Sequence, residues 1–182
     1  VLIRFYRPTS GASGLCPDTA MGVPLRKLDE HMARSLLEST HHAWYNGEIE
    51  RMLSYYADDC TYWNNAGSLD GAPFILEGKA HLRTFLTSIH AVAESATVIE
   101  NFQFEDGVAR AHVAAYIRHR RTGHVLSGTF RQVITYRGRK IQRNEEFHDA
   151  AKMAAFWKMV TCDGSGEALK SIESSRTIEP SE

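Results

Sequence analysis

The stretch Arg137–Val160, RGRKIQRNEEFHDAAKMAAFWKMV, holds the signals that decide the fold. Gly138 indicates a turn, residues 140–148 are typical of a strand, and Asp149 is placed to cap a helix that begins at Ala150. Side chains alternate between the two faces of a strand. One face is therefore wholly polar and carries Gln142, Asn144, Glu146 and His148, whereas the other carries Ile141, Arg143, Glu145 and Phe147.

The polar face of this strand has two interpretations. An antiparallel strand commonly shows one face to water and covers the core with the other, which would bury Ile141 and Phe147. In the second interpretation the polar face forms the wall of a pocket. Periodicity alone does not decide between them.

Three helices are predicted upstream of this strand. Apolar residues at helical spacing predict a helix over residues 25–45, which Asn46-Gly47 closes, and a shorter helix over residues 48–56. A short strand over residues 60–65 and a loop over 67–73 separate them from a third amphipathic helix, Gly78–Ala93.

Four strands follow the third helix, the last of them being the strand described first. Turn signals at Asp106-Gly107, Thr122-Gly123 and Arg137-Gly138 separate strands over about 95–105, 108–119 and 124–136 from it. This order predicts an antiparallel meander. Helices followed by strands indicate an α+β domain with the helices on one face of a curved sheet.

The inner, concave face of that sheet follows from alternation along each strand. The first strand contributes Ala96, Val98, Phe102 and Phe104; the second contributes Ala109, Ala111, Val113, Ala115 and Ile117; the third contributes Leu126, Gly128, Phe130, Ile134 and Tyr136. The second set is too small to fill the space under the helices, so we expect a cavity there.

Composition is that of one ordinary globular domain. The chain has 182 residues, 43% of them hydrophobic, and we place the domain at residues 25–160 between flexible tails, 1–24 and 161–182, with Met21 as the natural start. The net charge of −1 and the lack of a long apolar stretch indicate that the protein binds neither nucleic acid nor membranes. We therefore expect a cytoplasmic location. The three cysteines, Cys16, Cys60 and Cys162, match no metal spacing and are expected to be free thiols.

Three motifs together resemble a known superfamily. They are NGEIE (46–50) with YADDCTY (56–62), LEGK (76–79), and GRKI (138–141) with FHD (147–149). Residues 25–160 resemble the NTF2-like superfamily and are most similar to its SnoaL-like and ketosteroid-isomerase-like branch. The resemblance implies a cone-shaped α+β fold, with three N-terminal helices on a curved, mostly antiparallel sheet and a short C-terminal helix.

The resemblance also assigns the faces of the last strand. It implies that Asn144, Glu146 and His148 lie inside the cone and that Ile141 and Phe147 lie on the convex face. Many members dimerise through that face. With Val125, Val133 and Tyr116 beside them, these residues would form an apolar patch, so we expect a homodimer through the convex sheet face.

Carried over position by position, the family's catalytic residues are only partly present. The steroid isomerases' base, oxyanion-hole tyrosine and protonated acid fall on Asn64, Thr40 and Gln132, so that mechanism is not expected. The limonene-type epoxide hydrolases match at Tyr62-Trp63-Asn64 and Glu146, but their arginine and acid fall on Val113 and Ala115. The SnoaL-type polyketide cyclases keep a carboxylate for which Glu146 is the counterpart.

The predicted site centres on Glu146, whose pKa we expect apolar walls to raise towards neutrality. His148, Asn64 and Tyr62 are the predicted catalytic helpers. The predicted substrate-binding residues are Thr40, Trp44, Val113, Ala115, Phe130, Gln132 and Asn144. Each pair also has an explanation without catalysis. Glu146 and His148 could form a structural hydrogen bond, and Tyr62 and Asn64 could simply hydrogen-bond to each other at the end of a strand. At most one of His41 and His42 can face the cavity, and we expect both at the surface.

Two functions remain open from the sequence. The first is a SnoaL-like enzyme, an isomerase, cyclase, dehydratase or epoxide hydrolase, that acts by acid/base chemistry on a small apolar molecule without metal or organic cofactor. The second is a non-catalytic ligand-binding or dimerisation module of the same fold. A cavity that reaches Glu146 would favour the first.

Overall fold

The structure is a computed structural model that describes residues 27–66 and 72–161. Residues 1–26, 67–71 and 162–182 are outside the described residues. The predicted N-terminal tail with Met21 and Cys16, nearly all of the C-terminal tail with Cys162, and most of the predicted loop over 67–73 fall there. Cys60 is buried and carries a free thiol, as expected.

The described residues form four helices, α1 (Glu30–Tyr45), α2 (Ile49–Ser54), α3 (Gly78–Val92) and α4 (Ala150–Val160). Helix α1 starts later than predicted because the Asp29 side chain accepts a hydrogen bond from the Met32 N–H and caps it there. It ends as predicted at Asn46-Gly47, where Gly47 has φ +71°, a conformation that suits glycine. The Asp149 cap of α4 is confirmed by its bond from the Lys152 N–H.

Six strands form one sheet in the order β2-β1-β6-β5-β4-β3. Their bounds are β1 Tyr56–Asn64, β2 Phe74–Glu77, β3 Ala93–Glu105, β4 Val108–His119, β5 Val125–Arg137 and β6 Lys140–Phe147. The meander from β3 to β6 is antiparallel, as predicted, and only β1 with β6 pairs in parallel within this sheet. Strand β1 begins at Tyr56, which the sequence had placed in the second helix, and the short edge strand β2 was not predicted.

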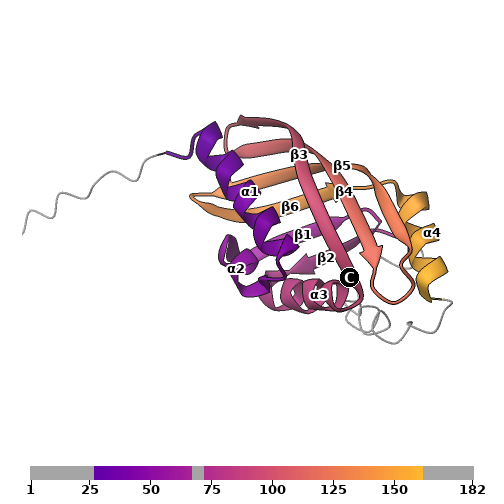
Figure 1. The fold of residues 1–182 in the computed structure, drawn as a ribbon. Coiled ribbons are helices and arrows are strands. Elements are labelled where there is room, and N and C mark those ends of the chain that lie inside the picture. Colours follow the sequence, from indigo (N-terminus) through magenta and orange to yellow (C-terminus); the bar gives the residue numbers. More distant parts are fainter. Residues whose placement is uncertain (1–26, 67–71, 162–182) are drawn as a thin grey trace, which may run out of the picture.

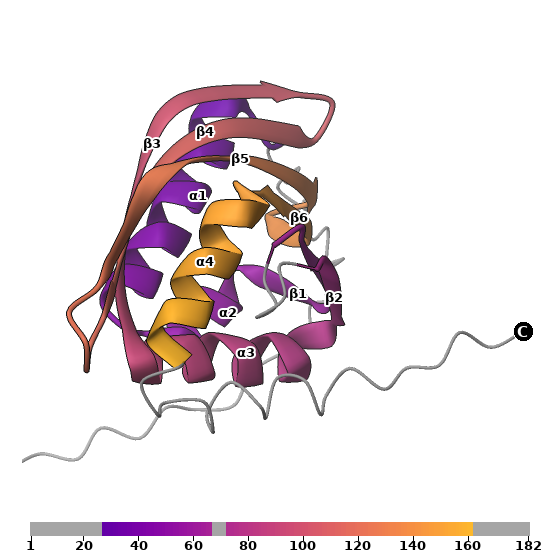
Figure 2. The same cartoon turned by 90° about the vertical axis from the view of Figure 1, so that its right-hand side faces the viewer.

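The sheet curls around the helices and confirms the predicted cone (Figures 1 and 2). Helix α1 crosses the concave side against β3, and α3 lies below it. Helix α4 lies at one end of the curl beside β5 (Figures 1 and 2), where Phe156, Trp157 and Val160 pack with Ala93 in a small second core. The helices and the sheet together enclose the space in which the polar residues of β6 lie.

A bulge in β3 reverses part of the predicted concave face. The pairing of β3 with β4 shifts between Ile99 and Asn101, so Glu100 is an extra residue. Val98, predicted to lie inside, is 64% exposed on the convex face with Ala96. Ser95 and Thr97 point inwards instead.

A second bulge moves Ile141 into the core. The pairing of β5 with β6 shifts between Thr135 and Tyr136, so Gln142 has no opposite residue. Ile141 is 1% exposed, and its predicted place on the convex face is wrong. Phe147 does lie on that face, next to Trp63 at a ring-centroid distance of 4.9 Å and under the Arg131 guanidinium.

None of the helices in the described part of the chain is long and apolar enough to cross a membrane.

Candidate active site

A cavity of about 110 Å³ opens between the concave sheet and helices α1, α3 and α4. This volume is several times the roughly 10–15 Å³ that one water requires, so a small organic molecule fits. One part of its wall is apolar and includes Met52, Phe85, Leu86, Ile89, Ile117, Met153 and Trp157. A second cavity, beside His148, shares Phe130, Ala115 and Met153 with the first and extends it between β5 and α4.

The carboxylate of Glu146 is the centre of the polar wall. Its Oε2 atom accepts hydrogen bonds from the Tyr62 hydroxyl at 2.8 Å and from Asn64 Nδ2 at 3.4 Å, and lies 3.0 Å from His148 Nε2. Its Oε1 atom accepts from Gln132 Nε2 at 3.3 Å and from Asn144 Nδ2 at 3.4 Å. Five donors therefore surround one largely buried carboxylate.

The pairing of β1 with β6 explains why these side chains meet. In the parallel register Tyr62 is opposite Asn144 and Asn64 is opposite Glu146, so both inward residues of β1 face the inward residues of β6. On the other side of β6, Gln132 of β5 is opposite Glu146. Three adjacent strands thus each send polar side chains to the same point.

The pKa of Glu146 lies below its usual value, contrary to the prediction. Burial alone would raise this pKa, but the hydrogen bond and charge of His148 and the hydroxyl of Tyr62 together outweigh burial. The immediate neighbours of the carboxylate are amides, a phenol and an imidazole rather than the alanines of β4. Glu146 is therefore ionised at neutral pH.

The charge of Glu146 fixes the protons of its neighbours. An ionised carboxylate only accepts hydrogen bonds, so His148 must donate from Nε2. The ring of His148 stacks on Phe130 at a centroid distance of 4.4 Å, which holds its plane. Burial raises the pKa of Tyr62 well above its ordinary value, so its hydroxyl stays protonated and donates.

The structure brings together ten of the eleven residues predicted for the site. Thr40 is among the ten, although its hydroxyl donates to the Leu36 carbonyl at 2.8 Å within its own helix. Val113 is the exception, because it is fully buried in the core and does not line the cavity. The ten are Tyr62, Asn64, Glu146, His148, Thr40, Trp44, Ala115, Phe130, Gln132 and Asn144.

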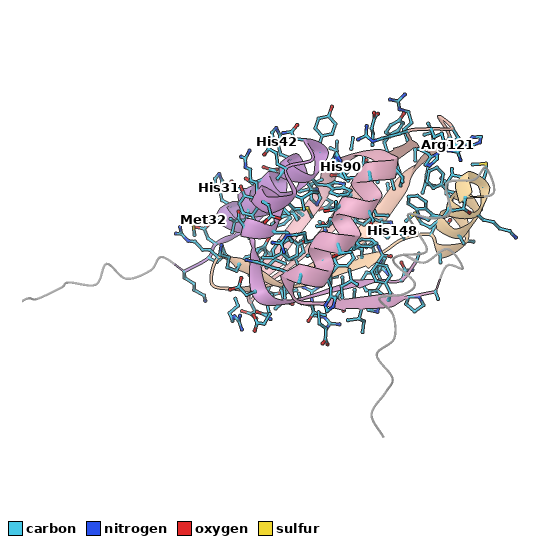
Figure 3. The ribbon with its side chains drawn as sticks, turned by 90° about the horizontal axis from the view of Figure 1, so that it is seen from below. His31, Met32, His42, His90, Arg121 and His148 are labelled. Atoms are coloured by element: carbon cyan, nitrogen blue, oxygen red, sulfur yellow. The ribbon has the colours of Figure 1, made fainter. Side chains whose placement is uncertain are left out.

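Sequence reasoning missed three polar residues that line the cavity. His41 was expected at the surface, but it faces inwards, whereas His42 is exposed on the outer side of α1 (Figure 3). The signal was present, since His41 lies four residues after Leu37 and three before Trp44, on the same helical stripe. Ser95 and Thr97 had no such signal, because the bulge at Glu100 reverses their face.

Among the described residues, no three His, Cys, Asp or Glu side chains are grouped so that they could hold a metal ion.

Comparison with known proteins identifies the family. The model of the SnoaL-like domain family matches residues 37–144. No curated protein is similar enough to the chain to count as a match.

Solved structures resemble the chain in fold at low sequence identity. A polyketide cyclase described as putative, from Xanthomonas campestris pv. campestris, has 16% identity and a TM-score of 0.60, over 70% of this chain and 98% of that one. An LEH-like epoxide hydrolase from M. tuberculosis has 13% identity and a TM-score of 0.59, over 74% and 96%. PrhC from Penicillium brasilianum NBRC 6234 has 12% identity and a TM-score of 0.67, over 78% and 96%. Since the family model covers more than half of the chain, the chain belongs to the SnoaL-like domain family.

Proposed function

We propose that this protein is a SnoaL-type enzyme that moves a proton on a small apolar substrate, using the Glu146–His148 pair and no cofactor. One observation carries the proposal: an ionised, largely buried carboxylate is hydrogen-bonded at 3.0 Å to an imidazole at the wall of a largely apolar cavity. A hydrogen-bonded carboxylate–imidazole pair of this kind is a proton-transfer device near neutral pH.

The geometry suggests separate roles for the two residues. In this proposal the neutral form of His148 accepts the proton at Nδ1, while Glu146 holds the ring through Nε2 and stabilises the imidazolium that forms. Tyr62 and Asn64 in turn hold the carboxylate. Removal of a proton from a carbon beside a carbonyl, or from a water, is a step shared by isomerases, cyclases, dehydratases and epoxide hydrolases.

A screen of enones, polyketide-like ketones and epoxides in D₂O, followed by mass spectrometry, tests the proposal. Deuterium incorporation or conversion by the wild type identifies a substrate. Glu146→Gln should then lower turnover by roughly a hundredfold or more, because it removes the charge that orients and stabilises His148. Glu145→Gln, the neighbouring carboxylate on the opposite face, is the matched control and should leave turnover unchanged.

A second variant distinguishes the role of His148 from that of Glu146. His148→Gln retains an amide nitrogen near the position of Nε2 but has no counterpart of Nδ1. Turnover as low as that of Glu146→Gln is the expected result. Full activity of His148→Gln would make the carboxylate itself the acceptor, and full activity of Glu146→Gln would end the acid/base assignment.

A ligand-binding module without catalysis is the second candidate. The observation that favours it is the saturation of Glu146 by five donors, which weakens a carboxylate as a base and is typical of a structural network. This candidate predicts ligand binding with neither deuterium exchange nor conversion in the same screen.

A further inference from the structure

The second cavity, between β5 and α4, has a volume of about 220 Å³ and contains a cationic side chain. We call it the outer cavity and the one that reaches Glu146 the inner cavity. His148 and Phe130 line both cavities, so one ligand can extend from the inner to the outer cavity. Among the described residues that line the two cavities, Lys152 of α4 is the only lysine or arginine.

Two small residues leave the space in which the Lys152 ammonium lies. Gly128 of β5 is opposite Ala115 of β4, and both residues line the outer cavity. Gly128 is two positions before Phe130, so the two residues share the concave face of the sheet. A Cβ atom added at Gly128 would lie 3.5 Å from Lys152 Nζ. The ammonium therefore reaches from α4 across the outer cavity to the concave side of β5.

The charge of Lys152 is not neutralised by a neighbouring carboxylate of the described residues. The ammonium has three protons, and it donates one of them to the Ser127 carbonyl, which is a neutral group. The nearby carboxylate of Asp149 accepts from the backbone N–H of Lys152, at 3.0 Å, and caps α4. Its charge lies at the positive end of the helix dipole. The side chain of Lys152 thus retains a net positive charge and donors for a further partner.

The two cavities differ in the sign of their functional charge. The inner cavity has the ionised Glu146 in a largely apolar wall, and the outer cavity has Lys152 next to exposed residues of β5. A negatively charged group on a ligand would be repelled at the inner end and attracted at the outer end. The charges therefore favour one direction of binding for an apolar molecule with one anionic end.

We propose that Lys152 binds a carboxylate of the substrate in the outer cavity, while the apolar body of the substrate lies in the inner cavity against His148. The substrate class is thus an apolar monocarboxylate. A carboxylate matches the site because it accepts charge-assisted hydrogen bonds from the ammonium. This inference deepens the proposed function and rests on it for which end of the substrate reacts.

Binding of two uncharged-body probes tests the carboxylate site without turnover. Phenylbutyrate and phenylbutanamide have nearly the same shape, but only the first has a negative charge. NMR titration of the protein at low salt gives their dissociation constants. The wild type should prefer the carboxylate by about threefold to tenfold, as expected for a charged hydrogen bond at a partly exposed site. The preference should shrink at about 0.5 M salt, because salt screens the charges.

Three variants assign the preference to Lys152. Lys152→Met keeps the unbranched stem and removes the charge, so it should reduce the preference to within about twofold. Lys152→Arg keeps the charge and should keep the preference. Lys158→Met is the matched control, because Lys158 is an exposed lysine of the same helix that lines neither cavity. It changes the net charge of the protein by the same amount and should keep the wild-type preference.

Four outcomes overturn the carboxylate site: no preference in the wild type, a preference that survives in Lys152→Met, an equal loss in Lys158→Met, or no binding of either probe. If the preference depends on Lys152 while the deuterium screen finds no proton transfer, the carboxylate site stands and the proposed function fails. If proton transfer is found and the preference is unchanged in Lys152→Met, the reverse holds.

Discussion

A single ionised side chain, Glu146, sets the proton positions of its whole neighbourhood. Because the carboxylate only accepts, it determines which nitrogen of His148 carries a proton, and through Gln132 it does the same for His41. In the neutral form of either imidazole, the acceptor nitrogen is then Nδ1.

The lowered pKa of Glu146 predicts how stability depends on pH. A carboxyl whose folded pKa lies below its unfolded value, near 4.5, stabilises the fold fully above that value and loses this contribution as pH falls through the folded pKa. Thermal unfolding of the wild type and of Glu146→Gln between pH 7 and pH 3 measures this contribution of Glu146 to the free energy of unfolding. The wild type should be the more stable protein at pH 7, by about 1–3 kcal/mol because the glutamine presents a donor to donors, and its advantage should shrink below pH 4.5. A pH-independent difference would contradict the lowered pKa.

At the residue scale, much of the site was predicted from strand alternation together with the resemblance to the NTF2-like superfamily, which assigned the polar face to the inside of the cone. Alternation counted along β6 placed Asn144, Glu146 and His148 on one face, and no bulge intervenes between them. Alternation carries no information on partners from other strands, so the pKa of Glu146 was predicted in the wrong direction. His41 was recoverable from helical spacing alone.

At the scale of the elements, the bulges of β3 and β6 are the features that the sequence did not predict. Alternation holds only while each residue has one partner, and an extra residue reverses the faces beyond it. Neither Glu100 nor Gln142 is a glycine or is adjacent to one, so the sequence contains no residue that would predict these bulges. The turns at Asp106-Gly107 and Gly138 were predictable because positive φ angles leave a visible residue preference.

Deleting Glu100 tests the role of the bulge in β3. Without the extra residue, Ser95 and Thr97 should turn outwards and the Trp44–Ser95 bond should be lost. We expect the free energy of unfolding to fall by about 1–3 kcal/mol in denaturant titration. Glu100→Ala keeps the residue count and should change stability by less than about 0.5 kcal/mol. Equal effects of the two changes would mean that the side chain, not the bulge, matters.

On the scale of the whole molecule, the bulges also redraw the convex face. They remove Ile141 from it and add Val98, which joins exposed Tyr116 and Val125. We propose that this patch forms a homodimer interface. The order of helices and strands was predictable because local periodicity and turn residues agree along most of the chain, whereas the cone was predicted from the resemblance to the NTF2-like superfamily.

Light scattering at micromolar concentration measures the proposed dimer. The wild type should have twice the monomer mass of 20.5 kDa, and Val98→Glu combined with Tyr116→Glu should return it to that mass, because both charges would be buried in the interface. Met159→Glu, at an exposed position of α4, is the control and should leave the mass unchanged. A wild-type mass near 20.5 kDa would refute the interface.

The parallel pairing of β1 with β6 has a consequence for the order in which the protein folds. A tight hairpin cannot join parallel strands, and Tyr62 and Glu146 are 84 positions apart in the chain. During synthesis, β1 leaves the ribosome long before its neighbour exists, whereas the hairpins from β3 to β5 can close as they emerge. The carboxylate network is thus among the last contacts to form. A nascent chain that has reached the end of β5 has most of the cavity walls but still lacks Glu146, the ionised group of the network.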